Sequence, residues 1–456
     1  MNALDLLRAE KPTYERPSLL RHQVGLMNKF GRQQARSALT HIDGVAIDEL
    51  VERHGSPLFV LSQRTLISRY RELYDAFSRR YPKVRIAWSY KTNYLEAVCR
   101  TFHQQGSWAE VVSPFEYEKA ISFGVPPEKI HWNGPYKPDD ALEAAVRGGS
   151  LIHIDGFEEI VRVERAARMA GVRPKVAVRL NMSLDGVAAW SRFGLNLESG
   201  QARDAVARIV RGGHVDLVGL HSHIGTFILD ANAYAQAASK VAAFANEIKR
   251  EHGIKLQFID MGGGFASPNT LKGQYHAGEL TAPSFARYAE AVCDGLLALD
   301  GPADELPTLV LETGRALVDE AGFLISTVHS TKRLPDGQRA MVLDAGVNVL
   351  FTSFWYQHEV LPAQPIRGPV EPVVLYGPLC MNIDVMRDAA SLPALSAGER
   401  VVFKNVGAYN MTQWMQFIAL RPAVVMIGTN GEVGRIRRAE TTADLGSFEE
   451  VPSWLR

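Results

Sequence analysis

The chain has 456 residues, of which 46% are apolar and 22% charged, a globular composition with room for two domains. Lys plus Arg equal Asp plus Glu, 50 against 50, so no net charge favours nucleic acid or an anionic membrane as a partner. Three scattered cysteines, Cys99, Cys293 and Cys380, argue against a disulfide framework or a zinc knuckle. With no membrane-length apolar run and no signal-peptide core, the sequence predicts a cytoplasmic protein.

The first segment of the chain differs in pattern from the rest. Residues 1–40 mix Arg, Gln and Leu with two prolines, which predicts a helical or partly disordered arm that helps contacts between subunits. A short helix pattern follows over 45–54 and ends at Gly55. We expect residues 1–57 to form this arm and a segment that packs on the C-terminal domain.

From residue 58 onward, strand-like and helical runs alternate, which is typical of parallel β/α units. About eight such units fill roughly 250 residues, the size of a closed (β/α)8 TIM barrel. We therefore predict an α/β fold with this barrel over 58–320, and a doubly wound open sheet is the alternative. Nine runs read as strands, so one lies outside the barrel or is not a strand: 58–61, 86–90, 109–113, 130–133, 151–155, 175–181, 217–221, 256–260 and 309–312. The helical patterns are 114–123, 138–147, 157–170, 202–210, 233–251 and 282–299.

The pattern changes after Glu320, where strands follow one another with Pro and Gly between them and almost no helix. This predicts a separate C-terminal β-sandwich or β-barrel domain over 321–456. Its strand-like runs are 322–328, 339–344, 371–376, 400–406 and 423–427.

Chemically distinctive residues stand where the predicted barrel strands end. Lys91 follows the run 86–90, at the position where barrel folds place their chemistry. A lone strand-end lysine is most often merely solvated, so its interpretation depends on what the other strand ends carry. His221 and His223 follow the strand 217–220, but no further ligand cluster stands at a metal-binding spacing, so we expect no metal.

Two more strand ends carry features that fit an anionic, aromatic ligand. Gly262, Gly263 and Gly264 let the backbone approach a ligand and point successive N–H groups at an anion, and their late position favours a single phosphate over a dinucleotide. The structural alternative is a tight turn, which is common for glycine pairs and less so for three glycines in a row. Glu312 ends the next strand, where a buried carboxylate needs a partner, either Arg315 or a protonated ring nitrogen.

In the predicted β domain, loops after three strands draw attention. Cys380 follows Gly377-Pro378 just after a strand, with Asp384 four residues on. The runs 344–348 (Asp-Ala-Gly-Val-Asn) and 407–410 (Gly-Ala-Tyr-Asn) follow two other strands.

In this order and at these intervals, the lysine, imidazole, glycine triplet, acid and cysteine resemble the motifs of one family. The chain resembles the pyridoxal phosphate (PLP)-dependent decarboxylases of the alanine-racemase-type fold, the group of diaminopimelate, ornithine and arginine decarboxylases. The resemblance is closest to the diaminopimelate branch and runs from about residue 56 to the C-terminus.

The resemblance implies a role for each matching residue. Lys91 would hold PLP as an imine, His223 would stack on its ring, and Glu312 would face the ring nitrogen. Thr226, Gly262, Gly263, Gly264 and Tyr409 match positions near the phosphate, and Arg315 ends the acid's motif. Cys380 matches the cysteine that reaches the active site of a partner subunit, which implies a homodimer with shared sites and a thiol that returns a proton to Cα.

The departures from the family concern the substrate. Diaminopimelate enzymes have Glu after the cysteine, where this chain has Met381, and they carry an arginine that the stretch 351–356 lacks. Thr313 replaces a proline, and Glu110 stands where many members have Asp. We predict substrate contacts at Met381, Asp384 and Tyr356.

These departures favour an amino acid or amino-acid conjugate, such as a citryl-linked siderophore precursor. An ordinary diaminopimelate decarboxylase, with Arg192 or His358 replacing the missing contacts, is the alternative. An amino-acid racemase would need a second base facing Lys91, and a non-catalytic PLP-binding homologue could dispense with Lys91 and Cys380. The Gly-Pro-Leu-Cys motif at 377–380 favours decarboxylation over racemisation, and the presence of both Lys91 and Cys380 weakens the non-catalytic alternative.

Overall fold

The computed structural model describes residues 38–274 and 276–456, which form two compact units. The first unit comprises 67–267 and 281–317, and the second comprises the described residues of 38–66, 268–280 and 318–456. The N-terminal arm expected over the first 40 residues falls almost wholly outside the described residues.

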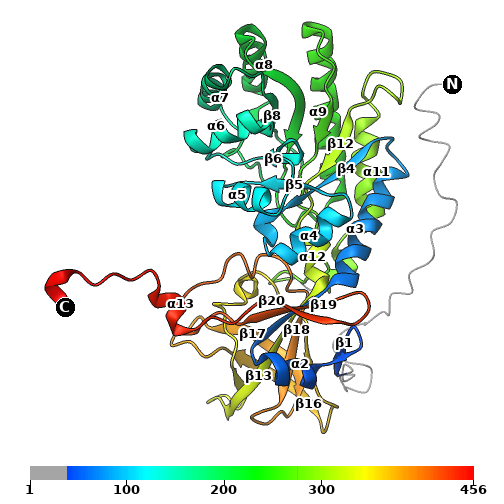
Figure 1. The fold of residues 1–456 in the computed structure, drawn as a ribbon. Coiled ribbons are helices and arrows are strands. Elements are labelled where there is room, and N and C mark those ends of the chain that lie inside the picture. Colours follow the sequence, from blue (N-terminus) through cyan, green and yellow to red (C-terminus); the bar gives the residue numbers. More distant parts are fainter. Residues whose placement is uncertain (1–37, 275) are drawn as a thin grey trace. The chain divides into compact units, whose positions relative to one another are not determined.

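The first unit is a closed barrel of eight parallel strands, as predicted (Figure 1). Its sheet runs β10-β11-β12-β4-β5-β6-β7-β8, and β8 pairs with β10 to close the ring, which excludes the doubly wound open sheet. The two-residue strand β9 (Leu195–Asn196) pairs with β8 beside the ring. The barrel strands are β4 (Val84–Ser89), β5 (Trp108–Val111), β6 (Ile130–Trp132), β7 (Leu151–Ile154), β8 (Lys175–Asn181), β10 (Asp216–Ser222), β11 (Phe258–Asp260) and β12 (Thr308–Leu311).

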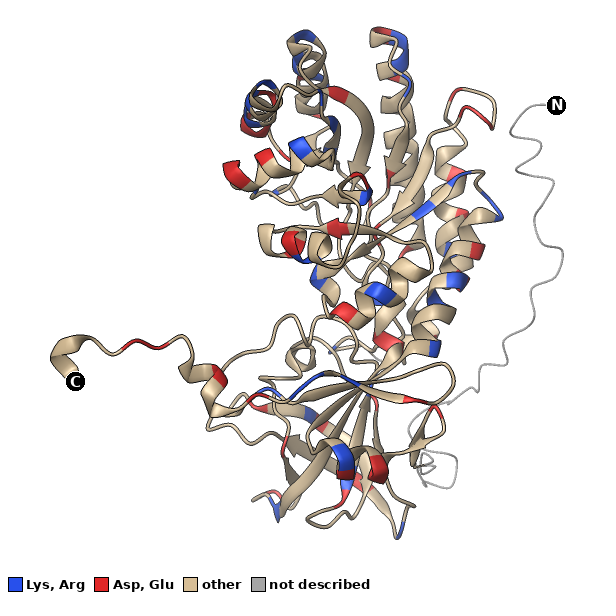
Figure 2. Ribbon diagram, viewed as in Figure 1, with Lys and Arg blue, Asp and Glu red and all other residues tan. Residues whose placement is uncertain are grey.

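Helices lie outside the ring of strands (Figure 1). Residues with odd and even positions on a strand face opposite sides, so Trp88 of β4 points outward and packs on Phe102, with ring centroids 4.2 Å apart. The charged residues of this unit, of both signs, are interspersed over the outer helices (Figure 2). The helices are α3 (Gln63–Ser78), α4 (Glu96–Gln104), α5 (Pro114–Ser122), α6 (Asp139–Gly148), α7 (Phe157–Ala170), α8 (Gln201–Gly212), α9 (Ala231–His252), α11 (Phe285–Leu296) and α12 (Arg315–Val318), while α10 (Gly278–Thr281) falls mostly in the second unit.

The inside of the barrel is layered. One apolar cluster contains buried residues from six strands: Ala87, Leu151, Ala177, Val218, Phe258 and Val310. Two positions further along five of these strands, on the same face, stand polar residues: Ser89, His153, Arg179, Asp260 and Glu312. The apolar layer thus forms a floor beneath a polar layer at the carboxyl ends of the strands.

The second unit contains a nine-stranded sheet with the path β17-β16-β14-β13-β3-β19-β20, which confirms a separate β domain. Strand β15 pairs with β18, and β18 pairs with β13. The strands are β3 (Leu58–Ser62), β13 (Gly322–Arg333), β14 (Arg339–Leu343), β15 (Val360–Pro362), β16 (Val370–Tyr376), β17 (Val385–Pro393), β18 (Arg400–Lys404), β19 (Ala423–Ile427) and β20 (Val433–Arg437).

Strand β3 corrects the expected start of the barrel at residue 58. It pairs with β13 and β19 of the second sheet, so it is the ninth strand-like run that the barrel cannot accommodate. All five of its residues are buried, which gives it the apolar look of a barrel strand. The hairpin of β1 (His41–Ile42) and β2 (Val45–Ala46) precedes α2 (Ile47–His54), whose Ile47 and Leu50 pack in one cluster with β3.

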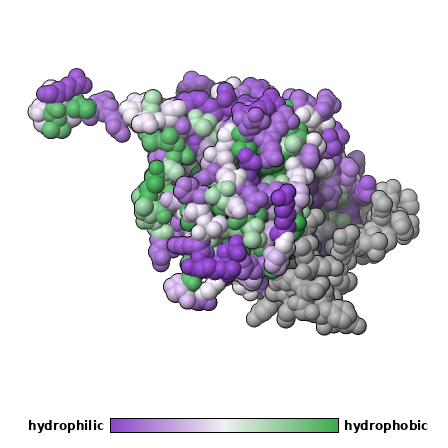
Figure 3. Space-filling view, turned by 90° about the horizontal axis from the view of Figure 1, so that it is seen from below, coloured by the Kyte–Doolittle hydropathy of each residue, from purple (hydrophilic) through white to green (hydrophobic). Residues whose placement is uncertain are grey.

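The C-terminal segment of the second unit follows α13 (Thr442–Gly446). It carries four large exposed apolar side chains, Phe448, Val451, Trp454 and Leu455. Green, hydrophobic surface is visible at the far end of this segment (Figure 3). Across residues 38–274 and 276–456, no helix combines the length and the apolar character that a membrane crossing needs.

Candidate active site

Lys91 lies just past β4, in a short 3-10 turn over Tyr90–Thr92. Its Nζ is 2.9 and 3.0 Å from the two carboxylate oxygens of Glu110 at the end of β5. The Glu110 side chain is fully buried while that of Lys91 is 37% exposed, so the amine stands at the open side of the pair. Ser89 Oγ donates a 2.5 Å hydrogen bond to the same carboxylate. In the sequence, Glu110 stands out only as a variant of the usual Asp, because its pairing with Lys91 arises only when the fold brings the two strand ends together.

Glu312, at the end of β12, is held by neutral partners. Asn133 Nδ2 donates a 2.6 Å hydrogen bond to one of its oxygens, and His221 Nε2 lies 3.1 Å from the other. Asn133 Nδ2 also reaches Glu110 at 3.3 Å, so this amide bridges two carboxylates. The ion pair with Arg315 is thus replaced by an amide and an imidazole, and the Arg315 guanidinium instead lies over the ring of Phe227.

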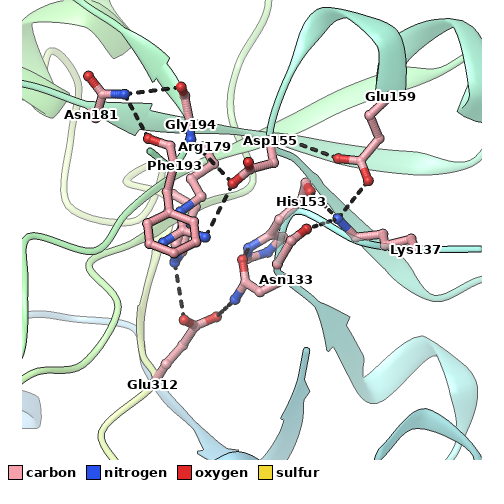
Figure 4. Close-up of polar contacts among 12 residues, drawn as sticks. Asn133, Lys137, His153, Asp155, Glu159, Arg179, Asn181, Phe193, Gly194 and Glu312 are labelled. Carbon is pink, nitrogen blue, oxygen red and sulfur yellow. Dashed lines mark hydrogen bonds and ion pairs between the residues drawn. The ribbon is translucent and has the colours of Figure 1, made fainter. Parts of the chain in front are cut away.

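The imidazoles around Glu312 carry no positive charge near neutral pH. Burial lowers the pKa of His153, His221 and His223 well below the usual value of histidine. His153 Nδ1 is 2.6 Å from Asn133 Oδ1, which fixes the amide that contacts Glu312 (Figure 4). None of these three rings therefore offers Glu312 a positive charge.

The glycine loop after β11 is forced by close packing. Gly262 and Gly264 have φ angles of +64° and +91°, in the left-handed region that favours glycine. A Cβ at Gly263 would lie 2.5 Å from the carbonyl oxygen of Glu312, and one at Gly264 would lie 2.2 Å from that of Gly225. Each glycine thus sits where another strand end leaves no room for a side chain.

The sequence suggested that the glycine loop points successive N–H groups at a ligand. In the structure, two of these N–H groups bind the protein itself. Gly262 N–H donates to Asp260 Oδ1 at 2.8 Å, and Gly263 N–H donates to His223 Nδ1 at 3.0 Å. The second of these bonds fixes the ring of His223, which also neighbours the ring of Trp190, with centroids 5.5 Å apart. A small pocket opens here, lined by residues of 180–190 and 222–224. Thr226 is exposed, next to Gly225.

The second unit carries the remaining predicted residues. Cys380 is exposed in the loop after β16, and Met381 is half-buried. Asp384 is buried, and its two oxygens accept 2.8 Å hydrogen bonds from the backbone N–H groups of Val347 and Leu379. Because both oxygens are used in this way, Asp384 braces the loop, and the expected substrate contact is not the role that its geometry favours.

Two tyrosines of the second unit have unusual settings. Tyr409 has a φ angle of +62°, a strained conformation that tends to occur at functional sites when its surroundings enforce it. The neighbouring Asn410 is anchored to Thr352 N and to the carbonyl of Val406. Tyr356 is buried and packs edge-to-face on His358, so its ring is already part of the domain core.

Comparison with known proteins gives the class. Residues 66–319 match the family model described as pyridoxal-dependent decarboxylase, pyridoxal binding domain, and the chain belongs to this family. A diaminopimelate decarboxylase of Methanocaldococcus jannaschii is 30% identical over 433 residues, covering 91% of this chain and 95% of the relative. One from Bacillus subtilis is 28% identical over 422 residues, covering 89% and 93%.

Solved structures agree. The crystal structure of diaminopimelate decarboxylase from M. jannaschii in complex with L-lysine has a TM-score of 0.83 and 29% sequence identity, and covers 93% of this chain and 98% of that one. This protein is accordingly a PLP-dependent decarboxylase, a carboxy-lyase. The barrel mouth suits PLP for three reasons. The amine of Lys91 is paired with the buried Glu110, and Glu312 is held by neutral hydrogen-bond donors. The loop of Gly262, Gly263 and Gly264 has no side chains to block a ligand.

We expect Lys91→Ala to abolish the visible absorption band of the bound cofactor, together with activity. The surface variant Lys240→Ala should keep both. Because the substitution leaves Glu110 buried without its cation, a loss of fold could mimic the result. Borohydride reduction of the wild type followed by peptide mapping decides the matter independently, since an adduct on any lysine other than Lys91 contradicts the assignment.

We expect Gly264→Ala to raise the dissociation constant for PLP about tenfold or more, the equivalent of only 1.4 kcal/mol. The new Cβ would strike the carbonyl of Gly225 and displace the loop. Gly253→Ala is the matched control, because its φ is also positive, at +68°, but the space around it is open. Fluorescence titration of the two purified variants should separate them, and equal affinities would show that the close packing at Gly264 is irrelevant to the cofactor.

Proposed function

We propose that this decarboxylase acts on diaminopimelate and releases the carboxylate of one α-carbon, which leaves lysine. The observation that carries the proposal is the similarity to enzymes of that name over nearly the full length of both chains. The siderophore-type conjugate expected from the sequence has no such support. A cytoplasmic location stays a prediction from the sequence.

We assign the roles in the barrel as follows. The amine of Lys91 would bind the cofactor, Glu312 would face its ring nitrogen, and His223 would lie against the ring. When bound, PLP serves as the electron sink for the bond between Cα and the carboxylate. The chain's own contribution is orientation and charge: Glu312 supplies a negative charge that neutral partners do not quench, and Gly263 N–H fixes the plane of His223.

The proton that replaces carbon dioxide at Cα needs a donor, and Cys380 is our candidate. Its thiol is exposed, and the loop that bears it is held by Asp384 through Leu379 N–H. Proton transfer from a positioned group typically contributes roughly 10²–10⁴ in rate. By the family resemblance, this thiol serves the site of a neighbouring subunit.

The distal carboxylate of diaminopimelate requires a cation that the family's usual arginine does not provide here. His358 is not available, because it is fully buried and lies 2.8 Å from Thr352 Oγ1. Arg192 is exposed, in the same loop as Trp190, whose ring neighbours that of His223. We therefore propose Arg192 as the residue that binds the distal carboxylate.

A second candidate substrate is an amino-acid conjugate with an extended distal part. It is favoured by Met381, a thioether that cannot accept the charge-assisted hydrogen bond of a distal ammonium as the usual Glu would.

We expect kcat/KM to be highest for meso-diaminopimelate in a panel that includes lysine, ornithine and citryl-linked amino acids, and to reach about 10⁴ M⁻¹s⁻¹ or more. Arg192→Ala should raise KM for diaminopimelate while leaving that for lysine, which lacks the distal carboxylate, nearly unchanged. Arg208→Ala, on the outer helix α8, is the control. Faster turnover of a conjugate would reverse the choice between the two candidates.

We further propose a homodimer with shared active sites, in which Lys91 of one subunit works with the thiol of the other. Mixing inactive Lys91→Ala with inactive Cys380→Ala should then restore activity through hybrid dimers with one intact site, about a quarter of the wild-type level if subunits exchange at random. Mass spectrometry must verify the hybrids. Verified hybrids without activity would exclude sharing of this kind.

A further inference from the structure

A second acid, Asp260, lies beside Glu312 inside the barrel, and the decarboxylase mechanism gives it no role. Its side chain is fully buried at the end of β11. Gly262 N–H donates to Oδ1, whereas Oδ2 has no hydrogen-bond partner in the described part of the chain. The nearby ring nitrogen His131 Nδ1 lies 3.5 Å away, and an oxygen of Glu312 lies within 4.8 Å.

Two ionised carboxylates at this separation would need a cation, and the cations nearby are engaged elsewhere. Lys91 pairs with Glu110, Arg179 pairs with Asp155, and the Arg85 guanidinium stacks on Trp108. The imidazoles cannot compensate, because burial lowers the pKa of His131 to about 4 and lowers the pKa of His153 and His221 well below its usual value.

Most of the surroundings of Asp260 raise the pKa of its carboxyl group. Burial, followed by the charge of Glu312, raises the pKa of Asp260 well above the usual value of aspartic acid, and Glu110 adds to the effect. The Gly262 N–H opposes this rise in pKa but does not outweigh it. Adjacent carboxyl groups that share a buried site commonly hold one proton between them.

We propose that Asp260 is a neutral carboxylic acid with its proton on Oδ2, and that it thereby confines the negative charge of the pair to Glu312, the carboxylate assigned to the cofactor's ring nitrogen. Asp260 is then a positioning residue: it acts through Glu312 and does not touch the cofactor. The inference rests on PLP binding at the barrel mouth and is independent of which amino acid is the substrate.

A metal ion is the competing explanation for these side chains. Ligand-type atoms of His131, His153, Asp260 and Glu312 lie within 4.8 Å of one another. However, both oxygens of Glu312 already contact Asn133 and His221, and a cation there would cancel the charge that a ring-nitrogen proton requires. A proton on Asp260 satisfies the site without that loss.

Infrared spectroscopy of the cofactor-free protein tests the proposal directly. Burial raises the pKa of Glu116 to about 7, so spectra recorded well above that pH are free of its acid band. We expect a carboxylic-acid C=O band to persist there in the wild type and in the control Glu116→Gln, and to disappear in Asp260→Asn. Labelling with [4-¹³C]aspartate should shift the wild-type band, which assigns it to an aspartic acid and excludes a glutamic acid even if the variant does not fold. No aspartic-acid band, or a band unchanged in Asp260→Asn, overturns the proposal.

The effect on Glu312 has its own readout, the ¹⁵N resonance of ring-labelled PLP. In Asp260→Asn, the new side-chain amide would still accept from Gly262 N–H and offer a donor in place of the acid proton, so the ring nitrogen should remain protonated. Glu312→Gln should shift the resonance to that of an unprotonated ring and lower kcat about 10²-fold or more. A deprotonated ring in Asp260→Asn, or stoichiometric metal in the purified wild type, contradicts the proposal. The infrared band, the ¹⁵N resonance and the metal content do not depend on the substrate, so a failed substrate panel would leave these three results intact.

Discussion

The polar centre of this barrel depends on how one buried carboxylate, that of Glu312, is partnered. An isolated ionised acid in such surroundings is very costly. The fold meets the cost at Glu312 with hydrogen-bond donors that carry no charge, an amide and an imidazole, 2.6 and 3.1 Å away. A cationic partner would have stabilised the acid more simply, but it would have left no net charge for a ligand. Lys91, a cation at the barrel mouth, forms its ion pair with Glu110 and not with Glu312.

The polar layer at the carboxyl ends of the barrel strands explains why the site residues could be predicted from the sequence. Strand residues two apart face the same side, so a run such as Leu309 to Glu312 carries both the barrel floor and the chemistry above it. Lys91, His223, the glycine triplet and Glu312 each stand directly after a strand, and parallel strands bring all their carboxyl ends to one face. The alternation of strand-like and helical runs predicted the barrel, and the order of these residues predicted the class of enzyme through the family that they resemble.

What the sequence could not supply is the pairing across the barrel. Asn133 and Glu312 are 179 positions apart, and nothing local marks an asparagine as the bridge between two acids. The internal use of the Gly262 and Gly263 N–H groups was also hidden, since a glycine run looks the same whether its donors face a ligand or the protein. Strand β3 was misplaced because a fully buried strand has the same apolar composition in either sheet. Strand β17 was missed because only part of its Val385–Pro393 run is buried.

In the loop after β16 of the second unit, some residues are held in place by Asp384 and the side chain at 381 is not. Asp384 accepts from both Val347 and Leu379, so one carboxylate ties two loops together. Gly346 and Gly377 lie so close to Asp384 that a Cβ on either glycine would come within 2.7 Å of a carboxylate oxygen of Asp384. Cys380 directly follows Leu379 and is therefore held through the backbone, whereas the side chain at 381 takes no part in the brace. Met can stand there without moving the thiol, because position 381 contributes to the loop only its carbonyl oxygen, which accepts from Asp384 N–H at 3.0 Å. Under the roles proposed above, the side chain at 381 can therefore differ from the usual Glu while the proposed proton donor keeps its place.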